Sequence, residues 1–539
     1  MLKKEIDMKQ DIALVLLLSA LLVSGSGCGG GDNRYPAPRA DTRADSIVTR
    51  AGTFEIGSKK YAADFGTITV PENRSKPASR IINIPFLRIH SHSQNPAEPV
   101  FGFAGGPGAS NMSWDPGKAS AFLPKHDFVL VGYRGVDGST VLDCPEVAEA
   151  FKGDGDILGG KSMERIARAW GTDAESLAAR GVDLDGYTML EVIEDNESVR
   201  RALGYKLVDL LSESYGTRVA YLYGLKHPES IYRSAMIGVN PPGCFVWENG
   251  PTDELLRRYS ALWSRDSAMS SKTTDLYAAM QRVLNGMPRR WFVFPIDPGK
   301  VRVVTFALLF QRSTAAMVFD AYAAADRGDA SGLALMSFSY GFVVPSMATW
   351  GDLASKAVSA DFNPARNYSS DMDPSDTPLG SPMSKMLWGP MTYGHWPVEQ
   401  LPTQYLRTRA SDVETLLLSG SVDFSTPPQN ATEKLLPYLA KGRQVILSEC
   451  GHVNDVWYAK PGNARLMLTS FYDTGVPDTS LNTYVPMDFN VKWGFPAIAK
   501  ASLGGIVFII MAVVAVPVWI IRRRRVRKSS EASFNRTGP

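Results

Sequence analysis

Two serines one residue apart are the first candidates for chemistry in this sequence. Ser212 and Ser214 lie in the stretch 207–224, "LVDLLSESYGTRVAYLYG", where an apolar run meets a turn and then a helical pattern. A serine presented on so sharp a strand-to-helix turn needs small residues two positions before and two positions after it. Around Ser214 these are Ser212 and Gly216, whereas around Ser212 the first would be Leu210, which would clash. The spacing therefore predicts that Ser214 is a nucleophile.

A histidine and an aspartate late in the chain can activate this serine. A serine hydroxyl is a weak nucleophile until an adjacent base takes its proton, and the base must itself be oriented. His452, in "LSECGHVND", follows the apolar run "RQVIL", and Asp423 ends the preceding run in "LLLSGSVDF". The chain order Ser214, Asp423, His452 is that of the α/β-hydrolases. The competing interpretations are a structural histidine and a turn aspartate before Thr-Pro-Pro.

A glycine-rich turn, "FGFAGGPGAS", supplies the fourth chemical element. Attack on a carbonyl creates an oxyanion that backbone N–H groups must stabilise. We expect one donor to be Tyr215, directly after the nucleophile, and the other to be Gly106, because Pro107 has no N–H. The turn lacks the spacing and the lysine of a phosphate-binding loop. No cofactor and no metal is expected.

The apolar pattern around these residues predicts an α/β fold. Runs rich in β-branched residues occur in 66–73, 80–90, 99–108 and 126–135, and helical and strand patterns then alternate as far as Pro242. Helical patterns and Pro- and Ser-rich loops fill 243–404, and strand–helix alternation returns afterwards. We therefore expect a core in 51–242 and 405–490, with a helical cap in 243–404 inserted before the last two core strands.

Five of these motifs together resemble one family. "FAGGPGAS", "VLVGYRGVDGST", "LLSESYGTRVAYLYGLKHPESI", "SGSVDFSTPPQNA" and "ECGHVND" are similar, in this order, to the prolyl/tripeptidyl aminopeptidases, which are α/β-hydrolases. The resemblance implies that Ser214, Asp423 and His452 are catalytic, that the Gly-Gly-Pro-Gly loop lines an oxyanion hole, and that a helical cap covers the site. This sequence departs from the family at Ala104, where histidine is common, at Ser212, where glycine is, and at Tyr133, where glutamine is.

The substrate stays open at this point. An aminopeptidase acting on peptides is the first interpretation, and an esterase or other acyl hydrolase acting on a small acyl substrate is the second. A serine carboxypeptidase would use Glu213 to hold the terminal carboxylate of its substrate, and a non-catalytic surface-binding protein is a fourth alternative. An aminopeptidase needs an acid for the substrate ammonium, and Glu248 in "WENGP" is a candidate.

Both ends of the chain predict export to the bacterial cell envelope. Residues 1–28 have lysines, an apolar run and small residues, the layout of a signal peptide, and Cys28 resembles the lipidated cysteine of a bacterial lipoprotein. Residues 29–50 read as a linker. Residues 501–521 carry no charge and are long enough to span a bilayer, and 522–539 form a basic cytoplasmic tail. A net charge of +2 without a basic stripe gives no reason to expect a nucleic acid.

Three cysteines remain in the exported body, so at most one disulfide can form within it. Cys144 and Cys244 follow strands whose loops, in this fold, emerge at the same edge of the sheet. We expect these two to pair, which leaves Cys450 as a free thiol beside His452.

Overall fold

The computed structural model describes residues 34–39 and 41–505. The predicted signal peptide with Cys28, most of the predicted span 501–521 and the basic tail lie outside the described residues. Within 34–39 and 41–505, no single helix has the length and hydropathy needed to cross a bilayer. One consecutive pair, Ser331–Ser346 and Trp350–Asp361, reaches them only together and is bent by 81° between its halves.

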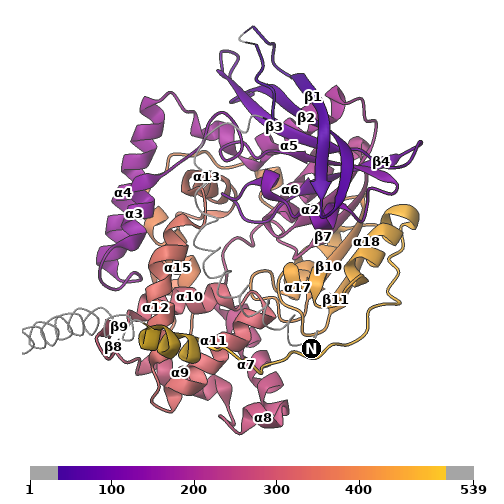
Figure 1. Ribbon diagram of the computed structural model, residues 1–539. Helices are drawn as coiled ribbons and strands as arrows, with labels where there is room; N and C mark the ends of the chain where they lie inside the picture. The colour runs from indigo at the N-terminus through magenta and orange to yellow at the C-terminus, as the bar shows by residue number, and fades with distance from the viewer. Residues whose placement is uncertain (1–33, 40, 506–539) are drawn as a thin grey trace, which may run out of the picture.

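A nine-stranded sheet forms the core of the molecule (Figure 1). Its strands lie in the order β1-β2-β3-β5-β4-β6-β7-β10-β11; β3 is antiparallel to both of its neighbours, and all pairs from β5 to β11 are parallel. The strand bounds are β1 (Ser46–Ile56), β2 (Lys59–Pro71), β3 (Ile81–Ile89), β4 (Ala97–Phe103), β5 (His126–Val131), β6 (Val208–Glu213), β7 (Ile231–Ile237), β10 (Glu414–Gly420) and β11 (Gly442–Leu447).

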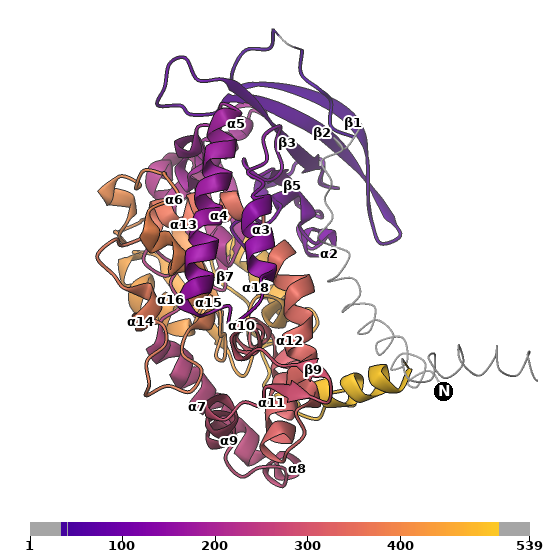
Figure 2. The same ribbon diagram turned by 90° about the vertical axis from the view of Figure 1, so that its left-hand side faces the viewer.

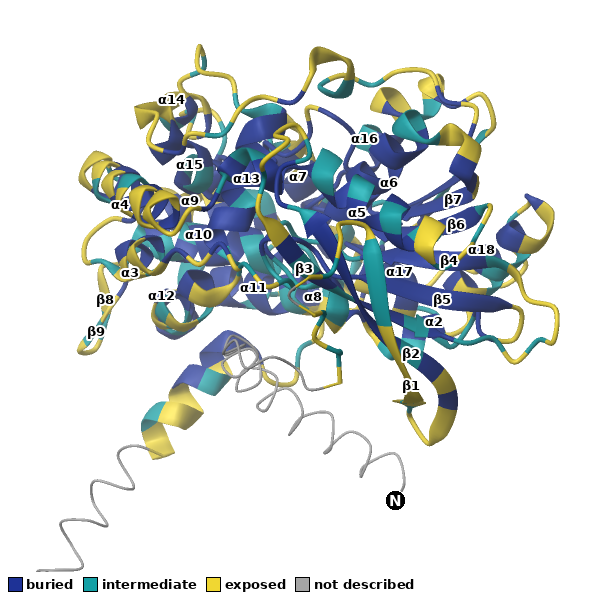
Figure 3. Ribbon diagram, turned by 90° about the horizontal axis from the view of Figure 1, so that it is seen from above, coloured by how far each residue is buried: buried dark blue, intermediate teal, exposed yellow. Residues whose placement is uncertain are grey.

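The middle strands are apolar because helices cover both faces of the sheet. Every residue of β5 and β6 is buried, whereas β1 at the edge is mostly exposed (Figure 3). One face packs against α5 (Met189–Ala202), α6 (Tyr215–Lys226) and α16 (Pro428–Lys434). The other packs against α2 (Pro116–Ala119), α17 (Asn454–Tyr458) and α18 (Asn463–Thr474). Parallel strands buried on both sides produce this continuous apolar pattern.

A helical cap lies between β7 and β10, where the sequence predicted an insertion before the last two core strands. Figure 1 shows most of its helices as one group below the sheet. They are α7 (Asn249–Arg265), α8 (Ser267–Ser270), α9 (Leu276–Asn285), α10 (Pro298–Leu308), α11 (Arg312–Asp326), α12 (Ser331–Val343), α13 (Trp350–Asp361), α14 (Tyr368–Asp371) and α15 (Pro382–Trp388), with a small hairpin of β8 (Arg290–Trp291) and β9 (Phe294–Pro295).

The cap also receives helices from a second stretch of the chain. α3 (Pro145–Lys152) and α4 (Gly160–Ala179), between β5 and β6, share one hydrophobic cluster with the cap helices. Phe151 of α3 packs on Trp350 of α13 with ring centroids 4.6 Å apart. Figure 2 shows α3 and α4 running alongside α10, α12 and α15. The cap is therefore built from two insertions.

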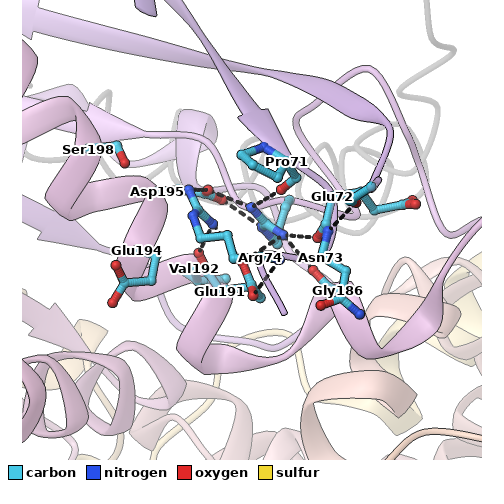
Figure 4. Close-up of polar contacts among 12 residues, drawn as sticks. Pro71, Glu72, Asn73, Arg74, Gly186, Glu191, Val192, Glu194, Asp195 and Ser198 are labelled. Atoms are coloured by element: carbon cyan, nitrogen blue, oxygen red, sulfur yellow. Dashed lines mark hydrogen bonds and ion pairs between the residues drawn. The ribbon is translucent and has the colours of Figure 1, made fainter. Parts of the chain in front are cut away.

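A buried ionic network fixes the loop after β5. Arg134, fully buried, donates to both carboxylate oxygens of Asp195 over 2.6 and 2.7 Å and to the carbonyls of Glu72 and Gly186. Figure 4 shows Arg74 between Glu191 and Asp195, to which it also donates. Every oxygen in this cluster faces a donor, so the network joins the end of β2, helix α5 and the loop after β5 rigidly.

Candidate active site

Ser214 occupies the sharp turn that the sequence predicted. β6 ends at Glu213 and α6 begins at Tyr215, so the serine alone connects strand and helix. Its φ of 51° and ψ of −120° are rare for a residue with a side chain and cost about 1–3 kcal/mol. The Ser214 N–H donates to the Ile237 carbonyl over 2.8 Å, which ties the turn to β7. The strain presents the hydroxyl at the end of the sheet, in a cavity.

Ser212, the other candidate, faces the interior. Its side chain is fully buried in β6 and donates to the Ala235 carbonyl of β7 over 3.1 Å. A hydroxyl already bonded between two strands has a structural role, and its small size lets the turn form.

His452 and Asp423 are paired as the sequence predicted. His452 Nδ1 lies 2.8 Å from Asp423 Oδ2 and 3.1 Å from Oδ1, and the aspartate is fully buried. The Asp423 carboxylate also accepts the N–H groups of Ser425 and Thr426 over 2.9 and 2.8 Å. A carboxylate held in this way keeps the proton on Nδ1, so that Nε2 is the basic nitrogen of the ring.

Thr426 is a site residue that sequence reasoning missed. Its hydroxyl lies 2.8 Å from Asp423 Oδ2 and 3.2 Å from His452 Nδ1, so it contacts both members of the pair. Thr426 lies three residues after the aspartate, at the start of Thr-Pro-Pro. From sequence, this motif indicates only a turn. The threonine limits how far the ring can rotate on its carboxylate.

Ser214 and His452 line the same cavity. Within the described chain, no hydrogen bond joins the Ser214 hydroxyl to the His452 ring. Such contacts are often long without substrate and tighten when it binds. Ser214 and His452 therefore face one cavity, and Asp423 lies behind the histidine, outside the residues that line it.

The Gly-Gly-Pro-Gly loop lies against the serine. A β-carbon at Gly105 would come within 2.8 Å of Ser214 Cβ, so only glycine permits this approach. Gly106, with a φ of +76°, lines the cavity beside Tyr215. In the described part of the chain, neither the Gly106 N–H nor the Tyr215 N–H donates to a protein acceptor. Both of the predicted oxyanion donors are therefore available to a ligand at Ser214.

The cavity measures about 360 Å³ and lies between the core and the cap. Residues of the cap and of the loop after β7 give it an apolar wall: Phe245, Trp247, Phe310, Met347, Ala348, Leu353, Ala354, Ala357, Val358, Leu387, Trp388 and Met391. The cap is bonded to the core on both sides of the site, since Phe310 O accepts the His452 N–H over 2.7 Å and Gly108 O accepts the Thr349 N–H over 2.8 Å.

Glu213 is the single acid among the residues that line the cavity. Its carboxylate is ion-paired with Lys118, whose Nζ lies 2.9 and 3.0 Å from the two oxygens, and accepts the Trp457 indole N–H over 2.5 Å. Both charged side chains are buried, and Lys118 also lies over the Trp457 ring. Within the described residues, Oε1 accepts from both Lys118 and Trp457, and Oε2 accepts from Lys118.

The candidate Glu248 is wrong as a cavity acid. Its carboxylate forms a two-pronged ion pair with Arg366, both contacts 2.7 Å long, and it lies outside the residues that line the cavity. Glu248 directly precedes α7, where its pairing with Arg366 joins two parts of the cap.

The predicted disulfide between Cys144 and Cys244 is also wrong, because both are free, buried thiols. Cys144 packs under the cap, with its Sγ 3.7 Å from the Leu142 carbonyl, and burial raises the pKa of its thiol far above the usual value. Cys244 lies elsewhere, 3.4 Å from Lys434 Nζ beside α16. The two loops leave the same edge of the sheet but turn to different neighbours.

Cys450 is a free, buried thiol as well, and its burial raises the pKa of the thiol to about 11. In residues 34–39 and 41–505, no three His, Cys, Asp or Glu side chains are grouped so that they could hold a metal ion.

Gly238 leads to a prediction about the histidine. A β-carbon at this residue, whose φ is +67°, would lie 2.8 Å from His452 Cε1 and 3.1 Å from Thr426 Oγ1. Gly238→Ala should therefore displace the ring and lower kcat by about 10²-fold, as a shift of about 1 Å can. The control is Gly243→Ala, also at positive φ but with open space around it. Equal kcat losses in the two variants, measured on folded protein, would contradict the prediction.

Comparison with known proteins identifies relatives for part of the chain. No protein-family model matches it. A tripeptidyl aminopeptidase of Streptomyces coelicolor is 28% identical over 233 residues, which cover 38% of this chain and 42% of the relative. A tripeptidyl aminopeptidase of Streptomyces lividans is 28% identical over 232 residues, with the same two shares. The chain thus matches less than half the length of these curated relatives.

Among solved structures, an α/β-hydrolase enzyme from a Medee basin deep-sea metagenome library has a TM-score of 0.35 and 13% identity, covering 74% of this chain and 97% of its own. A thermophilic esterase from Thermogutta terrifontis has a TM-score of 0.32 and 13% identity, covering 77% and 99%. The sheet order and the turn at Ser214 confirm the predicted α/β-hydrolase fold, and the Streptomyces relatives confirm the resemblance to tripeptidyl aminopeptidases.

Proposed function

We propose that this relative of the tripeptidyl aminopeptidases is a serine hydrolase that works through an acyl-enzyme on Ser214. The observation that carries the proposal is the meeting, in one capped cavity, of a serine on a strained turn with a histidine bonded to a buried aspartate. The strain at Ser214 opposes folding, so the position of this serine is not explained by stability.

Each step of the reaction has a group to perform it. His452 Nε2 takes the hydroxyl proton as Ser214 Oγ bonds to the substrate carbonyl carbon, and the resulting oxyanion accepts the N–H groups of Gly106 and Tyr215. The imidazolium, stabilised by Asp423, returns the proton to the leaving amine or alcohol as the bond to it breaks. Water then attacks the acyl-enzyme by the same route and releases the acid.

We further propose that the substrate is a peptide cleaved near its amino terminus, with release of single residues or short peptides. A cavity covered by a cap favours a chain end over a continuous chain. A buried substrate ammonium needs a carboxylate, since an unpaired buried charge costs several kcal/mol. Glu213, next to the nucleophile, is the acid within reach. The two Streptomyces relatives support the same substrate class.

A second candidate is an esterase or other acyl hydrolase, which the apolar wall of the cavity favours. Such a substrate would fill the space with an apolar acyl chain and would leave the pairing of Glu213 with Lys118 undisturbed. The carboxypeptidase alternative is weaker, because the Glu213 carboxylate, which is ion-paired with Lys118, carries the same charge as the substrate carboxylate that it would have to bind.

We also propose that the chain acts outside the cytoplasm of a bacterium, held in the membrane by 501–521 and by a lipid on Cys28. The order of charges and apolar residues at the two ends supports this placement.

The amine hypothesis predicts that prolyl and tripeptidyl amides with a free amino terminus are hydrolysed, while their N-acetylated forms are not. Acetylation removes the charge that Glu213 would pair with and adds bulk at the closed end of the cavity. The measurement is kcat/KM for each matched pair, with short-chain esters as a reference. Equal values for free and acetylated amides would instead support the esterase.

A further inference from the structure

The hairpin of β8 and β9 carries large apolar side chains into solvent. Phe292 and Val293 at its tip are 71% and 84% exposed. Trp291 packs edge-to-face on Phe292 and stacks on Phe294, with ring centroids 5.1 and 5.8 Å away. Apolar side chains placed together at a protruding tip are rare on a surface that meets only water and mark a site of interaction.

Helix α12 continues this surface. Phe338 and Phe342 are 64% and 50% exposed, and their ring centroids are 5.0 Å apart. Phe338 and Phe294 line one cleft, so the hairpin and the helix form a continuous surface. Beyond the helix, Met347 is 45% exposed and also lines the active-site cavity. We call Phe292, Val293, Phe338, Phe342 and Met347 the aromatic face; it runs from the hairpin to the wall of the cavity.

The described chain ends beside the same helix. The Ser331 hydroxyl at the start of α12 lies 3.5 Å from the Pro496 carbonyl, and Lys500 is ion-paired with Asp329 over 2.5 Å. Figures 1 and 2 both show the last described helical turns next to α12 and the hairpin. From this point the sequence continues into 501–521, which carries no charge and is long enough to span a bilayer.

We propose that the aromatic face lies on the surface of a lipid bilayer, so that the active-site cavity opens beside the membrane. The inference rests on the proposed membrane placement of the chain and adds to it which face of the enzyme touches lipid. Protruding phenylalanine and valine, with a tryptophan behind them, are the side chains that enter the boundary between headgroups and acyl chains.

Charge does not drive this contact. Arg289 and Arg290, at the start of the hairpin, are exposed, but so are Asp154 and Asp156, which line the same cleft as Arg289. With both signs present, binding should depend on apolar side chains and change little with the charge of the lipid. The exposed side chains at the hairpin tip can penetrate a bilayer.

The test places a fluorescent reporter on the face in the full-length chain. Cys28 is replaced by serine and Val293 by cysteine, which is labelled with a nitrobenzoxadiazole maleimide; the three other cysteines are buried. The matched control carries the label at Val476, which is 53% exposed and follows α18; Figure 1 shows α18 on the opposite side of the molecule from β8 and β9. Both proteins are reconstituted in phosphatidylcholine vesicles with and without lipids bearing a quencher on the acyl chain.

We expect a several-fold rise in emission at position 293 on reconstitution, quenching by the acyl-chain quencher, and neither effect at position 476. A label at Phe338→Cys should respond in the same way. Unresponsive labels at 293 and 338 on protein that floats with the vesicles would overturn the inference. So would a response that needs high protein concentration and no vesicles, since it would indicate a second copy.

Two further measurements test separately the two proposals on which this inference rests, namely membrane attachment and the activity of Ser214. Flotation reports whether the chain is held in the membrane at all, and reaction with a fluorophosphonate reports whether Ser214 is active. Phe292→Asp with Val293→Asp should abolish the response of a label at position 338 and leave hydrolysis of a soluble substrate unchanged, because neither residue lines the cavity. Loss of soluble activity in this variant would overturn the assignment of the hairpin to lipid contact alone.

Discussion

Ser214→Ala is expected to abolish turnover, whereas Ser212→Ala retains most of it. When residues act as one catalytic unit, removing one of them loses most of the rate enhancement that all of them provide together. The loss in kcat should therefore be about 10⁴-fold or more. Ser212 contributes only a hydrogen bond to the Ala235 carbonyl inside the sheet. Its removal should cost about 1 kcal/mol of stability and little activity.

The measurement combines steady-state kinetics with labelling by a fluorophosphonate, which reacts with an activated serine. The Ser214→Ala protein should not be labelled and should unfold near the temperature of the parent, because alanine keeps the β-carbon on which the strain of the turn depends. Comparable loss of labelling in both variants would refute the choice of nucleophile, and full labelling of Ser214→Ala would refute it outright.

The turn at Ser214 could be predicted from sequence because its chemistry is local. Small residues at positions 212 and 216 and an apolar run before them are requirements of one short segment. His452 and Asp423 followed from chain order, since each comes just after a strand in a fold whose strands end at one edge. The parallel core was predictable for the same reason: strands buried on both faces have a continuous apolar pattern.

Other features depend on contacts that no local pattern contains. Glu248 has the right charge for a cavity acid, but its position beside Arg366 is set by how two cap segments pack. The environments of Cys144 and Cys244 depend on which way two loops turn. Helices α3 and α4 belong to the cap because they share one apolar cluster with its helices. Their sequences show only that they are amphipathic helices between two core strands, not which surface they pack against.

A buried ion pair in the cap holds the Gly-Gly-Pro-Gly loop in place. Asp352 and Lys356 on α13 are both fully buried and are hydrogen-bonded to each other. Asp352 Oδ2 also accepts the Gly108 N–H over 2.9 Å, while the Thr349 N–H donates to Gly108 O over 2.8 Å. Both backbone groups of this glycine are thus bonded to the start of α13. Burial lowers the pKa of Lys356 and raises that of Asp352. Apolar side chains of similar size would therefore stabilise this part of the core at least as well as the charged pair.

The lysine extends this contact toward the nucleophile. Its Nζ lies 3.3 Å from the Arg134 carbonyl, and 5.2 and 5.9 Å from the ring centroids of Tyr133 and Tyr215. Tyr133, where the family has glutamine, donates to the Ala104 carbonyl over 3.0 Å, directly before the glycine loop. Asp352 therefore acts as a positioning residue for the loop that carries Gly106, through Gly108.

We accordingly expect Asp352→Asn to lower kcat by about 10²-fold with little change in KM, since an oxyanion donor that is displaced loses most of its effect. The asparagine side chain has one acceptor oxygen where the Asp352 carboxylate has two. Either the Gly108 N–H or the Lys356 ammonium group would therefore face the NH₂ group of the asparagine, which is itself a donor. Lys356→Met is the matched control, because it leaves the Asp352 carboxyl bonded to Gly108. Both variants break a buried pair and should lose about 3–5 kcal/mol of unfolding free energy.

A role limited to stability would lower the activity of the two variants in parallel with their unfolded fractions. A positioning role predicts that folded Asp352→Asn is much slower than folded Lys356→Met, with similar KM values. The measurement is kcat and KM at a temperature where both proteins are folded, together with their denaturant midpoints. Equal kcat in the two folded variants would show that the pair only fills the cap, and that the glycine loop holds its position without Asp352.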